Sequence, residues 1–212
     1  MPKYPIYLEL EDAHAVVIGA GSVAARKAKT LVATGAKVTV VARTIEPVFE
    51  ELCEGLPIEI VQGDYSKEHL QDAFLVIAAT DNNALNTEIF EDCQQLKILC
   101  NVVDVPPLCN FYVPAVIRRG DLQIAISTNG KCPAYAGHLR RKFQNLITEE
   151  HGRFLEVLDD ARKSIISKVP AEKRKELLSK LADDDSYQLF LDKGADDWKS
   201  LTQELIASYR TR

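Results

Sequence analysis

The sequence predicts an α/β fold with a doubly wound parallel sheet, on the strength of three observations. First, β-rich apolar runs alternate with helical stretches from residue 13 to about residue 103, as in βαβ units. Second, these runs are almost continuously Val, Ile, Ala and Leu, as expected for strands that helices cover on both faces. Third, a Gly-x-Gly-x-x-Ala motif follows the first run and opens the first helical stretch.

The alternation can be followed element by element. The strand candidates are AVVIGAG (15–21), KVTVVAR (37–43), PIEIV (57–61), FLVIAAT (74–80) and KILCNVV (97–103). The stretches between them have the apolar spacing of amphipathic helices; they are SVAARKAKTLVATG (22–35), TIEPVFEELCEG (44–55) and NNALNTEIFEDCQQL (82–96). Five parallel strands with helices on both faces follow from this order.

The architecture is expected to change near residue 110. Two further apolar runs, 111–117 and 122–127, are separated only by the turn-rich tetrapeptide Arg-Arg-Gly-Asp, which predicts an antiparallel pair. Pro133 then suits the first position of a helix, and residues 152–212 read as several short amphipathic helices. We therefore expect three parts: a dinucleotide-binding domain at 1–112, a small α+β region at 113–150 and a helical domain at 151–212.

Composition narrows the class of protein. The 212 residues carry a net charge of −5, which argues against general nucleic-acid or anionic-membrane binding. The start of the chain lacks a signal-peptide pattern, and no apolar run approaches about 18 residues, so we expect a cytoplasmic protein outside the membrane. The five cysteines form no Cys-x-x-Cys pair and the four histidines are scattered. We expect buried, unpaired cysteines and no protein-ligated metal.

The glycine motif indicates a phosphate site. Gly19 permits a tight turn, Gly21 lets a pyrophosphate approach the backbone, and Ala24 allows the helix to pack closely on the strand. The helix N-terminus favours an anion. A dinucleotide is the expected ligand; the alternative is a sheet of this type that has lost its ligand. Arg43 and Thr44 stand where NAD-specific sites often have an acidic residue, which by itself favours NADP.

Two further strand ends carry polar side chains. Asp104 follows the fifth strand, and ligands of open parallel sheets lie beyond the carboxyl ends of the strands, so we expect it to point toward the cofactor. A turn or helix cap is its alternative role. Thr80 and Asp81 follow the fourth strand at the same edge of the sheet, where Asp81 is expected to cap the next helix.

Charge is unevenly distributed along the chain. Residues 114–153 carry seven Lys or Arg against three Asp or Glu. This basic segment suits an anionic ligand, although a solvated helix face would have the same composition.

These residues resemble a known family, the precorrin-2 dehydrogenase/sirohydrochlorin ferrochelatase family, which includes the N-terminal part of siroheme synthases. The resemblance spans roughly residues 3–145. Its most specific parts are CNVVD followed by F-x-x-P-A, and S-x-x-G-x-x-P-x-x-A before a basic helix. It also rests on PIYL (5–8), the glycine-motif segment and IAATDNNALN (77–86).

The resemblance implies a Rossmann domain, a dimerisation region and helical C-terminal domain, a homodimer, and NAD+ as oxidant of precorrin-2. Family members also lack an acidic residue after the second strand, so NAD+ is favoured despite Arg43. Ser22 and Val23 match the family's phosphate-loop contacts, Arg43 and Thr44 match its adenosine-side contacts, and Asp104 matches its catalytic carboxylate. With Gly19 and Gly21, Thr80 completes the expected cofactor site.

Precorrin-2 is a tetrapyrrole polycarboxylate, which gives the basic segment a specific role as an anion-binding wall. The expected substrate-binding residues are Ser127, Asn129, Lys131, His138, Arg140 and Arg141. Some relatives have a serine that can be phosphorylated after the strand expected at 122–127. This chain has Thr128 there instead.

Two questions stay open at the level of sequence. Some family members also insert iron; a dehydrogenase alone is favoured here, because there is no second cluster of metal-escorting residues. The alternative function is a nucleotide-sensing Rossmann module without catalysis, against which Asp104 and the basic segment both argue.

Overall fold

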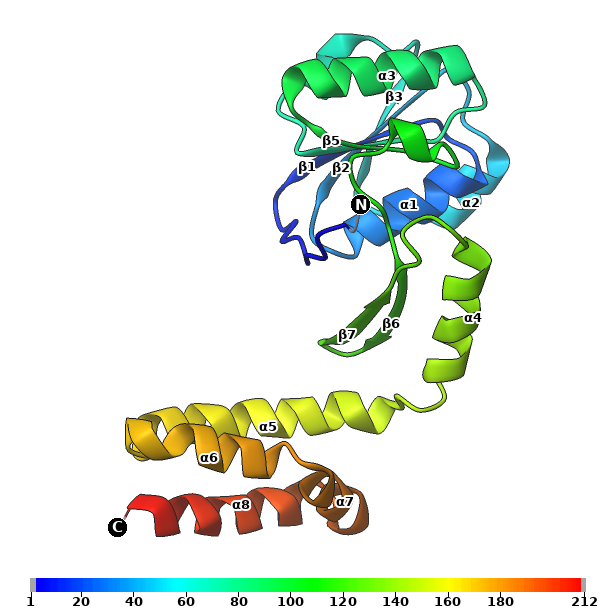
Figure 1. Ribbon diagram of the computed structural model, residues 1–212. Helices are drawn as coiled ribbons and strands as arrows, with labels where there is room; N and C mark the ends of the chain where they lie inside the picture. The colour runs from blue at the N-terminus through cyan, green and yellow to red at the C-terminus, as the bar shows by residue number, and fades with distance from the viewer. Residues whose placement is uncertain (1–2, 211–212) are drawn as a thin grey trace. The chain divides into compact units, whose positions relative to one another are not determined.

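Five parallel strands form the sheet that the alternating apolar runs predict, in the order β3-β2-β1-β4-β5 (Figure 1). The strands are β1 (His14–Ile18), β2 (Lys37–Ala42), β3 (Ile58–Gln62), β4 (Leu75–Ala78) and β5 (Leu99–Val102). The structure is a computed structural model that describes residues 3–210. The strand order reverses between β1 and β4, and ligands of doubly wound sheets bind at such a switch point.

Helices cover both faces of this sheet. α1 (Ser22–Val32) and α2 (Pro47–Cys53) pack on one face, and α3 (Asn83–Leu96) packs on the other. The 3₁₀ turns η1 (Lys67–Leu70) and η2 (Pro106–Leu108) lie in the connections. The Rossmann-type doubly wound sheet is thereby confirmed.

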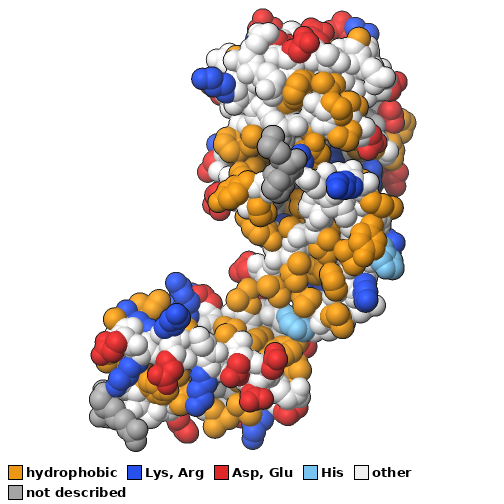
Figure 2. Space-filling view, in the orientation of Figure 1, with side chains coloured by type: hydrophobic (Ala, Val, Ile, Leu, Met, Phe, Trp, Pro, Cys, Tyr) orange, Lys and Arg blue, Asp and Glu red, His pale blue; other side chains and the backbone are white. Residues whose placement is uncertain are grey.

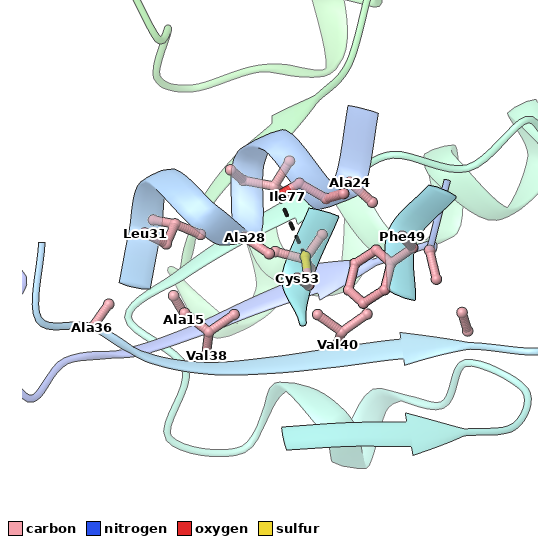
Figure 3. Close-up of a cluster of buried hydrophobic side chains, with 14 of the residues drawn as sticks. Ala15, Ala24, Ala28, Leu31, Ala36, Val38, Val40, Phe49, Cys53 and Ile77 are labelled. Atoms are coloured by element: carbon pink, nitrogen blue, oxygen red, sulfur yellow. Dashed lines mark hydrogen bonds between the residues drawn. The ribbon is translucent and has the colours of Figure 1, made fainter. Parts of the chain in front are cut away.

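The core beneath α1 and α2 is built from small and branched side chains. Figure 3 shows Ala24, Ala28 and Leu31 of α1 above Val38 and Val40 of β2, with Phe49 and Cys53 of α2 completing the cluster. Cys53 donates a weak hydrogen bond to the carbonyl of Ala25, 3.8 Å away. Alanines on α1 let it lie close to the sheet, which fixes the loop between β1 and α1.

The second part of the chain starts with an antiparallel hairpin, as expected. β6 (Ala115–Arg119) pairs with β7 (Leu122–Ile126) around Gly120, whose φ is +57°. Five helices follow: α4 (Pro133–Phe143), α5 (Glu149–Lys168), α6 (Ala171–Leu181), α7 (Asp184–Lys193) and α8 (Ala195–Arg210). Pro133 occupies the first turn of α4, as predicted. The core of the helices contains the buried aromatic side chains of Trp198, Phe154 and Phe190. Trp198 Nε1 donates a hydrogen bond to Ser186 Oγ at 3.0 Å.

The chain divides into two compact units, Met1–Val113 and Pro114–Arg212. The first contains the parallel sheet, and the second contains both the hairpin and the helices. The finer division at residues 112 and 150 stays a prediction.

The cysteines follow the expected pattern only in part. Cys53, Cys93 and Cys100 are buried and Cys109 is half-buried, but Cys132 is exposed at the start of α4, which corrects the expectation of burial there. Its place in a polar loop, between Lys131 and Pro133, explains the difference. All five are free thiols.

Candidate functional site

A cavity of about 760 Å³ opens at the carboxyl ends of β1, β2 and β4. The loops that follow β1, β2, β3 and β4 line it, and they contribute Gly19, Gly21, Arg43, Asp64 and Thr80. This is the switch point of the sheet, where a dinucleotide binds in folds of this type. Ser22, Val23 and Thr44 also line the cavity, so the structure brings all the expected cofactor residues together.

Gly19 cannot be replaced without distortion. Its φ is +110°, and a Cβ built on it would lie 2.4 Å from the backbone carbonyl oxygen of Ala79. β1 and β4 are adjacent parallel strands, so the turn after β1 passes directly against the turn after β4. Only glycine permits this crossing.

The N-terminus of α1 is available to an anion. Gly21 is the N-cap residue, no side chain caps the helix, and its first turn has no acidic residue. The first amides of a helix lack partners within the helix, and the helix dipole favours a phosphate there. The cradle formed by Gly19, Gly21 and this helix start therefore fits the pyrophosphate of a dinucleotide.

One acidic side chain lies beside this cradle. A Cβ built on Gly21 would lie 3.1 Å from Glu46 Oε1, and the Glu46 amide donates to the Ala20 carbonyl at 3.1 Å. Glu46 is exposed and is the N-cap residue of α2. No local sequence pattern predicts this contact, because it joins two loops that are more than twenty positions apart.

Arg43 has a carboxylate partner. Its Nε forms an ion pair with Asp64 Oδ1, and both side chains line the cavity. Asp64 was not among the expected site residues either; its one signal in the sequence is its position just after the third strand candidate.

Thr80 is held by the start of α3. Its Oγ1 donates to Asn86 Oδ1 at 2.7 Å and accepts from the Asn82 amide at 3.2 Å. The expectation that Asp81 caps α3 is wrong: the N-cap is Asn82, whose Oδ1 accepts from the amides of Ala84 and Leu85. The helix begins one residue later than expected, which leaves Asp81 exposed on the cavity wall.

Asp104 lies one strand away from the cavity. It is exposed in the turn after β5, has a left-handed φ of +60°, and is not among the residues that line the cavity. It does not cap η2, whose N-cap is Val105 with no side-chain cap bond. Burial, reinforced by Arg26, lowers the pKa of Lys27, and the charge of Asp104 acts in the opposite direction. Asp104 therefore lies near α1, and its catalytic role stays a prediction.

The expected substrate residues all belong to the second unit. Ser127, Asn129 and Lys131 lie in the exposed connection between β7 and α4, where Ser127 Oγ accepts from the Asn129 amide at 3.1 Å. The ring of His138 stacks on Tyr135, with centroids 6.1 Å apart.

The basic side chains of this unit differ in how far they are free to bind an anionic ligand. Among the residues that the structure describes, Arg140 and Arg141 have no ion-pair partner. Arg119 is used structurally: it donates to the carbonyls of Ile147 and Gln144 and pairs with Glu149. Arg140 and Arg141 lie in the last turn of α4, where cations also stabilise the helix dipole.

A larger groove, of about 1140 Å³, does not suit the expected substrate. It lies in the second unit between α5 and the α7–α8 connection. Its charged lining consists mainly of carboxylates, and two of these, Glu150 and Asp160, pair with Arg153 and Lys199. Figure 2 shows acidic and basic side chains interspersed over the α5–α8 helices. A negatively charged groove repels a polycarboxylate.

Within residues 3–210, no group of three or more His, Cys, Asp or Glu side chains is arranged to hold a metal ion. Of the helices that the structure describes, none combines the length and apolar character needed to cross a membrane.

Both units of the chain match known families, and the whole chain matches a solved structure. Residues 6–115 match the family described as "Putative NAD(P)-binding", and residues 119–146 match "Sirohaem biosynthesis protein central". A solved structure described as SirC, precorrin-2 dehydrogenase, aligns with a TM-score of 0.76 at 26% sequence identity, over 98% of this chain and 100% of that chain.

Curated relatives agree with these matches. Siroheme synthase 1 of Serratia proteamaculans (strain 568) is 38% identical over 157 residues, which are 74% of this chain and 33% of the relative. Siroheme synthase of Psychrobacter sp. (strain PRwf-1) is 35% identical over 170 residues, which are 80% of this chain and 35% of the relative. The chain thus spans about a third of the length of these relatives. From its first-unit match and the cradle at the start of α1, we conclude that the chain belongs to the NAD(P)-binding family represented in siroheme synthases.

Proposed function

We propose that the protein is an NAD+-dependent dehydrogenase that oxidises precorrin-2 to sirohydrochlorin in siroheme biosynthesis. The observation that carries this proposal is the alignment with a precorrin-2 dehydrogenase over nearly the whole of both chains. The match covers the hairpin and the C-terminal helices as well as the Rossmann sheet. A shared sheet alone would support only nucleotide binding.

The cofactor would be held by the loops around the cavity. The amides at the start of α1, with Ser22 and Val23, would bind the pyrophosphate, and Arg43 and Thr44 would contact the adenosine side. Thr80, fixed by Asn86, would form the wall at β4. A bound nicotinamide supplies the hydride acceptor for the oxidation.

Oxidation of the tetrapyrrole also releases a proton, which a carboxylate in position can accept. We assign this role to Asp104, which follows β5 and whose backbone is held in a left-handed conformation. Asp104 is exposed, so it is open to a ligand that approaches the carboxyl ends of the strands.

The carboxylates of the substrate would be bound by the second unit. Arg140 and Arg141 provide cations without ion-pair partners among the described residues, and Lys131 and His138 are exposed nearby in sequence. Ser127 and Asn129 add polar groups in the same connection. We also propose that residues 113–150 form the dimerisation region of a cytoplasmic homodimer. The exposed apolar side chains of Val116, Tyr135 and Leu146 support this.

An anaerobic assay tests the proposed function. Purified protein is mixed with enzymatically generated precorrin-2 and NAD+, and NADH formation is followed together with the product spectrum. We expect NADH and sirohydrochlorin in equal amounts. NAD+ binding without NADH formation would favour the alternative, a nucleotide-sensing module.

A further inference from the structure

The ion pair between Arg43 and Asp64 bears on cofactor choice. Arg43 alone, at the end of β2, favours a cofactor with a 2′-phosphate, because arginine accommodates that group in NADP sites. In this structure its guanidinium already bonds to a carboxylate. The local charge at this corner of the cavity is therefore balanced.

Strand register brings the two residues together. β2 and β3 are parallel, with Ala42 opposite Gln62, so the residues just beyond these strands meet at the same edge of the sheet. The Gly63 amide donates to the Ala42 carbonyl at 3.0 Å, and Gln62 Nε2 donates to the Arg43 carbonyl at 3.2 Å. These two hydrogen bonds hold the residues that follow β2 and β3 next to one another, and Asp64 pairs with Arg43 there.

The chemistry of the pair distinguishes a hydroxyl from a phosphate. A ribose 2′-hydroxyl can donate a hydrogen bond to Asp64, as it does to the acidic residue of NAD-specific sites. A 2′-phosphate carries a charge of about −1.5 to −2 and would meet the Asp64 carboxylate at the guanidinium. Asp64 reaches this position from β3, whereas the usual acidic residue follows β2.

We propose that Asp64 is a specificity-determining residue. By pairing with Arg43, it makes this part of the cavity suited to a ribose 2′-hydroxyl rather than to a 2′-phosphate. The inference rests on the proposed use of NAD+ and adds the residue that sets the preference. It resolves the conflict between Arg43, which favours NADP by its charge, and the family resemblance, which favours NAD+. The carboxylate that NAD-specific sites usually have after β2 is present here after the neighbouring strand, β3.

Solvent exposure limits how strongly Asp64 can change the preference between NAD+ and NADP+. Both side chains are largely exposed, at 78% for Arg43 and 69% for Asp64, so water screens their charges. In water, a carboxylate repels a phosphate dianion about 6 Å away strongly enough to weaken its binding about tenfold. We therefore expect a change in preference of about tenfold rather than a complete reversal.

Calorimetry with NAD+ and NADP+ on the full chain tests the inference. Asp64→Asn is expected to strengthen NADP+ binding about tenfold while NAD+ binding changes less than about threefold. Adding Arg43→Gln to this variant should remove the gain. Asp72→Asn is the matched control: Asp72 is exposed, lies before β4 outside this cavity, and has a φ of +58° that Asn tolerates.

An unchanged ratio of the two dissociation constants in Asp64→Asn, or a gain that persists without Arg43, would overturn the inference and leave the proposed function intact. If the wild-type protein binds neither dinucleotide, the proposed function fails, and the inference fails with it.

Discussion

The Glu46 carboxylate lies over Gly21, so that a Cβ added to Gly21 would be 3.1 Å from Glu46 Oε1. The contact places a negative charge beside the helix start that is expected to bind pyrophosphate. Glu46 is exposed, and its side chain can turn away when an anion approaches. The backbone of Gly21, in contrast, cannot give way without moving α1.

Replacing Gly21 with Asp should abolish dinucleotide binding. The new side chain and its charge would occupy the pyrophosphate position, and we expect NAD+ affinity to fall at least about 100-fold. Gly21→Ala adds a Cβ at the same place but no charge, and should lose less. Calorimetry measures both affinities, and a thermal melt checks that each variant is folded. Unchanged affinity in Gly21→Asp would exclude this loop as the dinucleotide site.

Neutralising Glu46 should have the opposite effect. Glu46→Gln removes a charge that repels the pyrophosphate, so NAD+ binding should strengthen about threefold, and more at low salt. Glu50→Gln, one turn further along α2 and outside the cavity, is the matched control. Weaker binding in Glu46→Gln would instead identify Glu46 as a direct ligand of the cofactor.

Close packing of α5 on the hairpin predicts a stability effect in the second unit. A Cβ built on Gly152 would lie 2.5 Å from the backbone carbonyl oxygen of Arg119, which cannot rotate away. Gly152→Ala should therefore lower the free energy of unfolding by about 1–3 kcal/mol. Denaturant unfolding measures this change.

Gly137→Ala is the control for that measurement. Gly137 lies within α4, and its added Cβ would come no closer than 3.7 Å to Arg141. Replacing a helical glycine with alanine there should stabilise by roughly 0.5–1 kcal/mol. Equal effects of the two substitutions would show that the α5 contact does not hold the hairpin.

The charge of α4 should matter for the substrate alone. Replacing both Arg140 and Arg141 with Ala should raise the KM for precorrin-2 several-fold, leave the Kd for NAD+ unchanged, and be mimicked in the wild type by added salt. The matched control replaces Arg162 and Lys163, two exposed cations of α5. Weaker NAD+ binding, or no change in KM, would show that the α4 cations are misassigned or merely solvated.

Local sequence signals predicted the elements well but not the contacts between loops. The five strands were evident because buried parallel strands are continuous apolar runs, and the glycine motif located the helix start. Asp81 and Asn82 are both good N-cap residues, so the boundary of α3 was ambiguous by one position. The pairing of Arg43 with Asp64 depends on the register of β2 on β3, which no local pattern encodes. The hydrogen bonds that Arg119 donates to carbonyls of the α4–α5 connection are likewise encoded by no local pattern.

Asp104 provides the sharpest test of the mechanism. Asp104→Asn keeps a residue type that tolerates the left-handed φ of +60°, so fold and NAD+ affinity should be preserved. Loss of a general base typically costs about 10²–10⁴-fold, which sets the expected fall in kcat. Single-turnover NADH formation, with NAD+ affinity and the melting temperature measured alongside, separates this loss from misfolding. A fall of less than about threefold would mean that another group accepts the proton, and that Asp104 is used only to turn the chain after β5.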